Sequence, residues 1–150
     1  MELGRIYRKT SETSYALGAS LAYELLITKP EIVLKVYFHA DFKKSDQFEQ
    51  FRQLCHEHNI NYENSDRVIN RLSKKENCYV IAEFIKFIDD INTDTNHLVL
   101  VNPGNMGNLG TIIRTAVGFN VYDIVMIRPA VDIFDPKTIR ASMGAIFHCR

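Results

Sequence analysis

The chain has 150 residues, of which 18 are basic and 18 acidic, so its formal net charge is zero. Hydrophobic residues make up 46% and charged residues 24%, a balance that is typical of folded proteins and argues against disorder. The length suffices for one ordinary domain, or for a small domain followed by part of another. A nucleic-acid-binding protein without net charge must concentrate its basic residues locally.

Basic residues do gather in three short groups along the chain. Each group is compatible with an anion-binding patch, but also with ordinary solvated surface charge. The groups are Arg5, Arg8 and Lys9; Lys43 and Lys44; and Arg67, Arg71, Lys74 and Lys75.

The cysteines indicate neither a disulfide framework nor a zinc site, because their number is odd, their spacings are wide and no Cys-x-x-Cys occurs. The run Cys55-His56-Glu57-His58 contains metal-ligating residue types. Adjacent residues of a helix point in different directions, so we predict no metal site there. The sequence also lacks a signal peptide and a long apolar run, which favours a cytoplasmic protein that does not enter a membrane.

The first part of the chain predicts alternating helices and strands. Leu17, Leu21 and Leu25 recur at i, i+4 and i+8, which predicts a helix over about 11–27. Ser45 and Ser65 are candidate N-caps of two further helices. We predict strands over 32–38, 60–62 and 78–85, the last of them buried on both faces.

A polar, turn-prone and acidic segment, 89–96, interrupts this pattern and indicates a domain boundary. We therefore predict a small α/β/α domain over 1–90, a linker over 91–96 and a second domain from 97 to 150. In this second part we expect a strand at 97–101, a glycine-rich loop at 102–110 and a helix that ends at about 117. A strand at 123–127, a helix over 136–141 capped by Asp135, and a strand from 144 onward should follow.

The glycine-rich loop is the first candidate binding feature. Its glycines, Gly104, Gly107 and Gly110, let the backbone turn tightly, and the following helix N-terminus attracts anions. The spacing matches neither the dinucleotide pattern Gly-x-Gly-x-x-Gly nor a P-loop. Both a phosphate site and a purely geometric strand-to-helix turn remain open at this point.

Arg114 is the second candidate. At ~100° per residue it lies roughly 130° from the centre of the helix's apolar face, so we expect it to be exposed. A planar guanidinium beside backbone donors suits a phosphate group. The alternative interpretation is an ordinary exposed helix arginine.

Residues 102–116 resemble the first motif of the SpoU or TrmH family of the SPOUT superfamily, which has the form Asn-x-Gly-x-x-x-Arg-Thr. The matching residues are Asn108, Gly110, Arg114 and Thr115, and Ser142-Met143-Gly144-Ala145 resembles the family's Ser-x-Gly-Ala signature. The two matches lie within 97–150. The resemblance implies an α/β domain with a deep trefoil knot, a homodimer, S-adenosylmethionine as methyl donor, and a ribose 2′-hydroxyl of tRNA or rRNA as acceptor.

By this resemblance Arg114 would lie at the reacting ribose with Asn108 beside it. Arginine stays protonated in proteins, so we expect it to hold a phosphate and stabilise the developing alkoxide rather than act as a base. Asn108 would position the substrate or the arginine. The residues of the substrate and phosphate loop would be Asn105, Gly107, Gly110 and Thr115.

The first part of the chain, about 11–87, resembles the substrate-binding domain that is similar to ribosomal protein L30e. It would bind RNA through phosphate contacts and shape, and the candidate contacts are Arg5, Arg8, Lys9 and Lys74.

The sequence ends at Arg150, before two later family motifs, so the residues that bind S-adenosylmethionine are unknown and expected beyond this point. These 150 residues alone are expected neither to complete the knot, nor to bind S-adenosylmethionine, nor to methylate RNA. Two other interpretations remain: a non-catalytic RNA-binding module, and an unrelated α/β nucleotide-binding domain.

Overall fold

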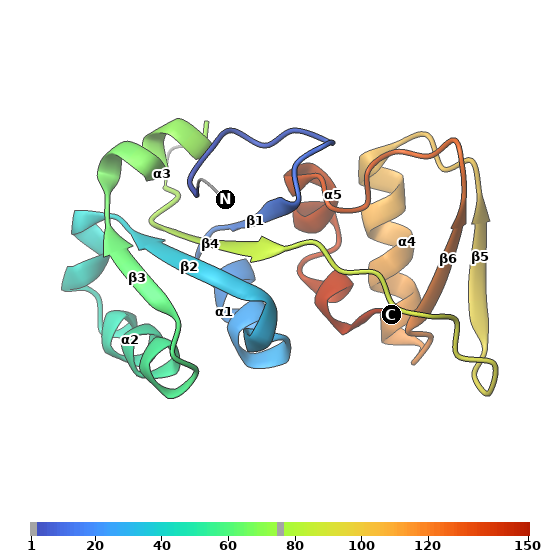
Figure 1. Cartoon of the computed structure of the whole chain (residues 1–150), viewed down its shortest axis with the longest axis horizontal. Coiled ribbons are helices and arrows are strands. Elements are labelled where there is room, and N and C mark those ends of the chain that lie inside the picture. Colours follow the sequence, from blue (N-terminus) through green and yellow to red (C-terminus); the bar gives the residue numbers. More distant parts are fainter. Residues whose placement is uncertain (1–2, 75–76) are drawn as a thin grey trace. The chain divides into compact units, whose positions relative to one another are not determined.

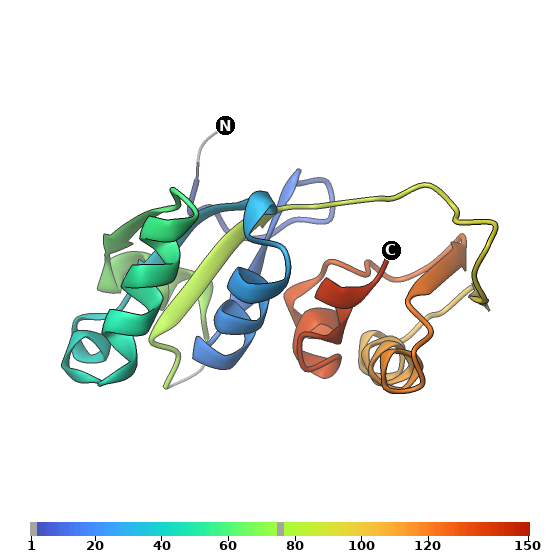
Figure 2. The ribbon, with the colours of Figure 1, turned by 90° about the horizontal axis from the view of Figure 1, so that it is seen from below.

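The computed structural model describes residues 3–74 and 77–150 (Figures 1 and 2). Lys75, one of the basic residues noted above, lies outside the described residues. The chain divides into two compact units, Met1–Lys86 and Phe87–Arg150. Among the described residues, no helix has the length and apolar character needed to cross a membrane.

The first unit is built on a four-stranded sheet with the order β1-β4-β2-β3 (Figure 1). The central strand β4 pairs antiparallel with β1 and β2, and β3 adds to β2 in parallel. The strands are β1 (Thr13–Leu17), β2 (Val33–Phe38), β3 (Asn61–Asn64) and β4 (Val80–Ile85). Burial of β4 from Val80 to Phe84 confirms the prediction of a strand covered on both faces.

Helices cover both faces of this sheet and make an α/β/α arrangement (Figures 1 and 2). On one face lie α1 (Ala19–Thr28) and α2 (Gln47–Glu57), and on the other lies α3 (Asp66–Leu72). Short 3-10 helices span Pro30–Ile32 and Ala40–Lys44. On the α3 side, a core cluster contains Tyr15, Tyr37, Ile69 and Ile81.

The predicted helix over 11–27 is wrong over nearly its first half, residues 11–18. Residues Thr13–Leu17 form β1, and the helix begins only at Ala19 after Gly18, whose φ is 111°. The leucine spacing reflects the helix correctly from Leu21 onward, but strand pairing with β4 takes the residues before Gly18. Tertiary pairing here prevails over a local helical period.

Of the two predicted serine caps, one is confirmed and one is wrong. The Ser65 side chain accepts a hydrogen bond from the Val68 N–H at 3.3 Å and begins α3. The Ser45 hydroxyl instead donates to the Phe42 carbonyl at 2.7 Å, so it closes the preceding 3-10 helix, and Asp46 stands at the start of α2.

The second unit contains two parallel strands joined by a helix. Strands β5 (His97–Val101) and β6 (Asp123–Ile127) pair in register from His97 opposite Asp123, and α4 (Met106–Gly118) connects them. The helix α5 (Pro136–Ala141) follows, with the Asp135 side chain accepting from the Lys137 N–H as predicted. The expected strand at 144–147 is wrong: Gly144 adopts a left-handed φ of 83° and starts a 3-10 helix, Ala145–His148.

Candidate functional site

The start of α4 is fixed by Asn105. Its side chain accepts a hydrogen bond from the Asn108 N–H at 2.9 Å, which caps the helix. The connection from β5 is therefore only 102–105, shorter than the predicted glycine-rich loop. Asn102 turns the chain with a left-handed φ of 51°, and the Pro103 carbonyl accepts from the Val131 N–H at 2.9 Å.

Gly110 belongs to the helix and not to the loop. It is buried, and a Cβ on it would lie 2.5 Å from the Ala141 Cβ and 2.7 Å from the Thr138 carbonyl oxygen. The glycine is therefore required by the close approach of α5 to α4. Gly107, also in α4, is exposed, and a Cβ there would meet only the Asn105 side chain at 3.3 Å.

Arg114 is exposed on α4, as predicted. The opposite side of the helix is buried and carries Leu109, Ile113 and Ala116. Within the described part of the chain, no hydrogen bond or ion pair engages the Arg114 side chain. An internal ion pair would have argued against an anion-binding role, and the structure places none among these residues.

The structure does not place Asn108 beside Arg114. Six residues apart on one helix, their Cα atoms are separated by ~9 Å along the axis and by roughly 120° around it. Thr115 lies on another side, where its hydroxyl donates to the Thr111 carbonyl at 2.9 Å. The six predicted site residues therefore surround the first three turns of α4 and do not converge on one point.

A hollow that the sequence did not indicate lies between α4 and the start of β5. Its volume is about 340 Å³, and its lining combines residues from three separate segments: Asn96, His97, Leu98, Thr111, Ile112, Thr115, Ala116 and Val121. His97 Nε2 is buried and has no hydrogen-bond partner among the described residues. No local motif marks such a hollow, because only the folded chain brings its walls together.

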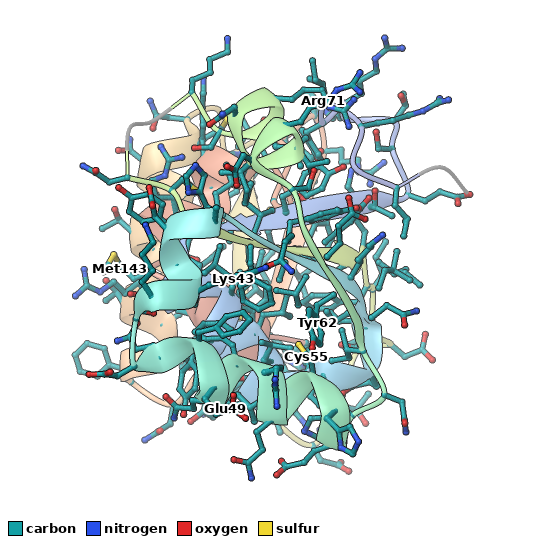
Figure 3. The ribbon with its side chains drawn as sticks, turned by 90° about the vertical axis from the view of Figure 1, so that its left-hand side faces the viewer. Lys43, Glu49, Cys55, Tyr62, Arg71 and Met143 are labelled. Carbon is teal, nitrogen blue, oxygen red and sulfur yellow. The ribbon has the colours of Figure 1, made fainter. Side chains whose placement is uncertain are left out.

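The candidate RNA contacts of the first unit are all exposed. Arg5, Arg8 and Lys9 lie on the segment before β1, and Lys74 follows α3. Arg71 (Figure 3), in the same basic group as Lys74, is also exposed. Its guanidinium donates to the Gly4 carbonyl of the N-terminal segment.

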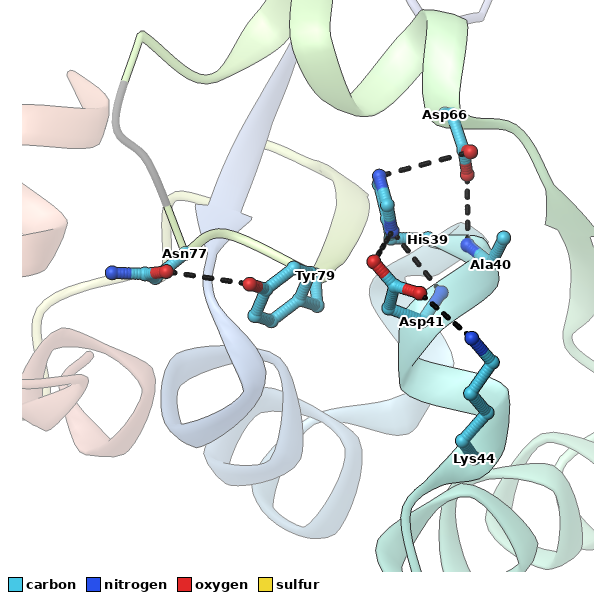
Figure 4. Close-up of polar contacts among 7 residues, drawn as sticks. All are labelled: His39, Ala40, Asp41, Lys44, Asp66, Asn77 and Tyr79. Atoms are coloured by element: carbon cyan, nitrogen blue, oxygen red, sulfur yellow. Dashed lines mark hydrogen bonds and ion pairs between the residues drawn. The ribbon is translucent and has the colours of Figure 1, made fainter.

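A polar network at the ends of β2 and β3 was not predicted (Figure 4). The His39 side chain accepts from the Asp41 N–H at 3.1 Å, while its Nε2 lies 3.7 Å from an Asp66 oxygen. The other Asp66 oxygen accepts from the Ala40 N–H at 2.8 Å. These contacts tie the strand ends together, so their evident role is structural.

The run Cys55-His56-Glu57-His58, which contains metal-ligating residue types, lies partly in the core and partly in solvent. Cys55 is fully buried on the inner side of α2 (Figure 3), and burial raises the pKa of its thiol to about 11. Its neighbours His56, Glu57 and His58 are exposed. The four side chains do not point toward a common centre.

Residues 95–150 match the SpoU rRNA Methylase family. Among curated relatives, the chain is 39% identical over 61 residues to rRNA methyltransferase 3, mitochondrial, of Xenopus laevis, covering 37% of this chain and 15% of the relative. It is 38% identical over 45 residues to a 23S rRNA (uridine(2479)-2′-O)-methyltransferase of Streptomyces viridochromogenes, covering 30% and 16%. The matches thus span only a small part of these relatives.

Solved structures share the fold over nearly the whole chain. An S-adenosylmethionine-bound rRNA methyltransferase from Sinorhizobium meliloti superposes with a TM-score of 0.74 at 24% identity, covering 92% of this chain and 52% of that one. The SpoU methyltransferase AviRb from Streptomyces viridochromogenes, in complex with the same cofactor, gives 0.74 at 18% identity, covering 92% and 54%. The chain spans about half of each solved protein.

Proposed function

We propose that this chain, whose residues 95–150 match the SpoU rRNA Methylase family, serves the methylation of a ribose 2′-hydroxyl in tRNA or rRNA. The match over residues 95–150 agrees with the resemblance seen in the sequence, and solved methyltransferases share the fold. The main support for this proposal is that Arg114, on the first helix of the matched segment, is exposed.

The chemistry assigned to Arg114 follows from what a 2′-hydroxyl requires. This group is a poor nucleophile and loses its proton as it attacks a methyl group. A guanidinium beside the hydroxyl lowers the energy of the developing alkoxide and can hold the adjacent phosphate in place. Because arginine stays protonated, the proton passes to another acceptor.

We propose S-adenosylmethionine as the methyl donor, which supplies an electrophilic methyl group when bound. We assign none of the described residues to its site. The space next to Gly110 is filled by α5, and the surface of the hollow beside His97 is largely apolar, which does not suit the amine and carboxylate of this cofactor.

The other residues around the start of α4 support the substrate side. Asn105 shapes the short loop by capping the helix, and Gly107 leaves the exposed backbone open to a phosphate. Asn108 would contact the substrate directly, because it does not lie beside Arg114. Thr115 would act from the neighbouring side of α4, and Gly110 would act indirectly by setting the position of α5.

We also propose that residues 1–90 form an RNA-binding domain similar to L30e, joined by 91–96 to a methyltransferase domain from 97 that would form a trefoil knot in the whole protein. Arg5, Arg8, Lys9 and Lys74 would contact RNA phosphates. A cytoplasmic location fits this substrate. Homodimer formation would cover the exposed side chains of Val99, Val101 and Ile127 on one face of the β5–β6 sheet.

The experiment that tests this function incubates the whole protein, not residues 1–150 alone, with radiolabelled S-adenosylmethionine and RNA from cells that lack the protein. A 2′-O-methyl group blocks alkaline cleavage at the neighbouring phosphodiester, so the label should appear in alkali-resistant dinucleotides. Label on a base would contradict the proposal. RNA binding without any methyl transfer would instead favour a non-catalytic RNA-binding module.

A further inference from the structure

Glu83 is a charged residue at the centre of the sheet of the first unit. It lies on β4 and is fully buried, where an apolar residue would be expected. Burying a carboxylate is costly unless hydrogen bonds compensate for the lost water. Four groups donate to its oxygens: the Gly4 N–H at 2.8 Å and the hydroxyls of Tyr37 at 2.9 Å, Tyr15 at 3.2 Å and Thr13 at 3.3 Å.

The backbone donor in this set comes from the N-terminal arm, defined here as residues 4–9. The single proton of the Tyr15 hydroxyl is shared between a Glu83 oxygen and the Arg5 carbonyl. Glu83 therefore holds the first two residues of the arm, one directly and one through a tyrosine. Burial, together with the negative charge of Glu83, raises the pKa of Tyr15 and Tyr37, so both stay neutral donors.

Two cations hold the remaining backbone of the arm. The Arg71 guanidinium of α3 donates to the Gly4 carbonyl. The Lys86 ammonium donates to the Lys9 carbonyl at 2.9 Å and lies 4.7 Å from the centre of the Tyr7 ring. The arm is thus fixed at both ends by residues distant in sequence, although it has no helix or strand of its own.

These contacts hold in place the backbone that carries several positively charged side chains. Arg5, Arg8 and Lys9 are exposed along the arm, and Arg71 adds a further exposed cation next to Gly4. Fixing the backbone that carries these side chains reduces the entropy lost when they bind an extended polyanion. A free N-terminal tail with the same charges would lack this advantage.

We propose that Glu83 is a positioning residue, which anchors the N-terminal arm so that Arg5, Arg8 and Lys9 together bind the phosphate backbone of RNA. This inference rests on the proposed RNA-binding function. It extends that function by assigning a role to a buried acid that does not itself touch RNA.

The test is the substitution Glu83→Gln, which nearly preserves shape but removes the charge. Glutamine offers one acceptor oxygen where the carboxylate offers two, so some of the four donors lose their partner. Removing a negative charge would strengthen RNA binding if only net charge mattered. We predict the opposite sign: affinity for a fluorescein-labelled RNA stem-loop falls roughly tenfold, and the slope of affinity against salt concentration becomes smaller.

A matched control is Glu31→Gln, which removes the same charge from an exposed glutamate and should not weaken binding. The decisive comparison repeats Glu83→Gln in a chain that already carries Arg5→Ala, Arg8→Ala and Lys9→Ala. If Glu83 acts through the arm, its substitution has little further effect there. An equal loss in both backgrounds overturns the inference, while absence of binding by the unaltered protein contradicts the proposed function itself.

Should Glu83→Gln fail to fold, Tyr37→Phe provides the same test. It removes one donor to Glu83 and leaves the arm sequence and the net charge unchanged. Faster amide hydrogen exchange at Gly4, together with weaker RNA binding that depends on the arm cations, supports the anchoring role. Faster exchange with unchanged RNA affinity overturns it.

Discussion

Gly110 of α4 and Ala141 of α5 meet where the two helices approach too closely for a second side chain, because a Cβ on the glycine would lie 2.5 Å from the Ala141 Cβ. The backbone of α5 is equally close, with the Ser142 nitrogen at 2.7 Å. The helix pair cannot accept even a methyl group at this position without moving apart.

We predict that Gly110→Ala destabilises the second unit by about 1–3 kcal/mol, the usual cost of overpacking. The matched control is Gly118→Ala in the same helix, where a Cβ would meet nothing within 4 Å. This second change should be neutral or stabilising by up to about 1 kcal/mol, because alanine favours helix. Urea unfolding of both variants checks the prediction, and equal stability of the two would contradict it.

Two substitutions of Asn105 separate its role as a helix cap from a role in phosphate binding. Asn105→Ala should cost about 1 kcal/mol in the free energy of unfolding, because the Asn108 N–H loses its acceptor. Asn105→Asp should preserve the cap and the stability. If a phosphate binds beside this residue, the added negative charge of Asp should nevertheless weaken RNA binding. Equal RNA affinity of Asn105→Asp and the unaltered protein would limit Asn105 to capping.

The buried tyrosines predict how the first unit responds to high pH. Burial first, and then the charge of Glu83, raise the pKa of Tyr15 and Tyr37 above the ordinary value of about 10. The unfolded chain therefore releases these protons at lower pH than the folded chain. The free energy of unfolding should fall progressively as the pH rises above about 10 and should not be affected by these groups below it.

Tyr37→Phe should make this decline shallower, because one of the two titrating groups is gone. Tyr62→Phe, which changes an exposed tyrosine of β3, should leave the slope unaltered. Urea unfolding across this pH range measures both slopes. A decline of the same steepness in Tyr37→Phe and the unaltered protein would contradict the argument.

Much of the fold could be predicted from the sequence because local patterns carry it. The apolar run before Ile85, the serine cap at Ser65 and the Asp135-Pro136 helix start each depend on neighbours in sequence. The β1 strand could not be predicted in this way. Its leucine continues the helical spacing of α1, and only pairing with β4 and the turn at Gly18 separate the two elements.

The candidate site was predictable to a similar degree. Exposure of Arg114 follows from helical periodicity, and the structure agrees. The roles of Gly110 and Glu83 were not predictable, since each depends on residues that are distant in the chain. Gly110 is constrained by α5, and the four donors to Glu83 come from three separate segments. Residue type alone could not distinguish a loop glycine from one at a helix crossing.

Arg114 is proposed to act on the ribose and its phosphate during methyl transfer. The most direct measurement is the rate of 2′-O-methylation at saturating RNA by the whole protein with Arg114→Ala, set against Arg52→Ala on an exposed face of α2. We predict that Arg114→Ala lowers this rate by roughly 10²–10³-fold, as expected when a donor to a developing oxyanion is removed. Arg52→Ala should keep the normal rate. An unchanged rate in Arg114→Ala would contradict the assigned role.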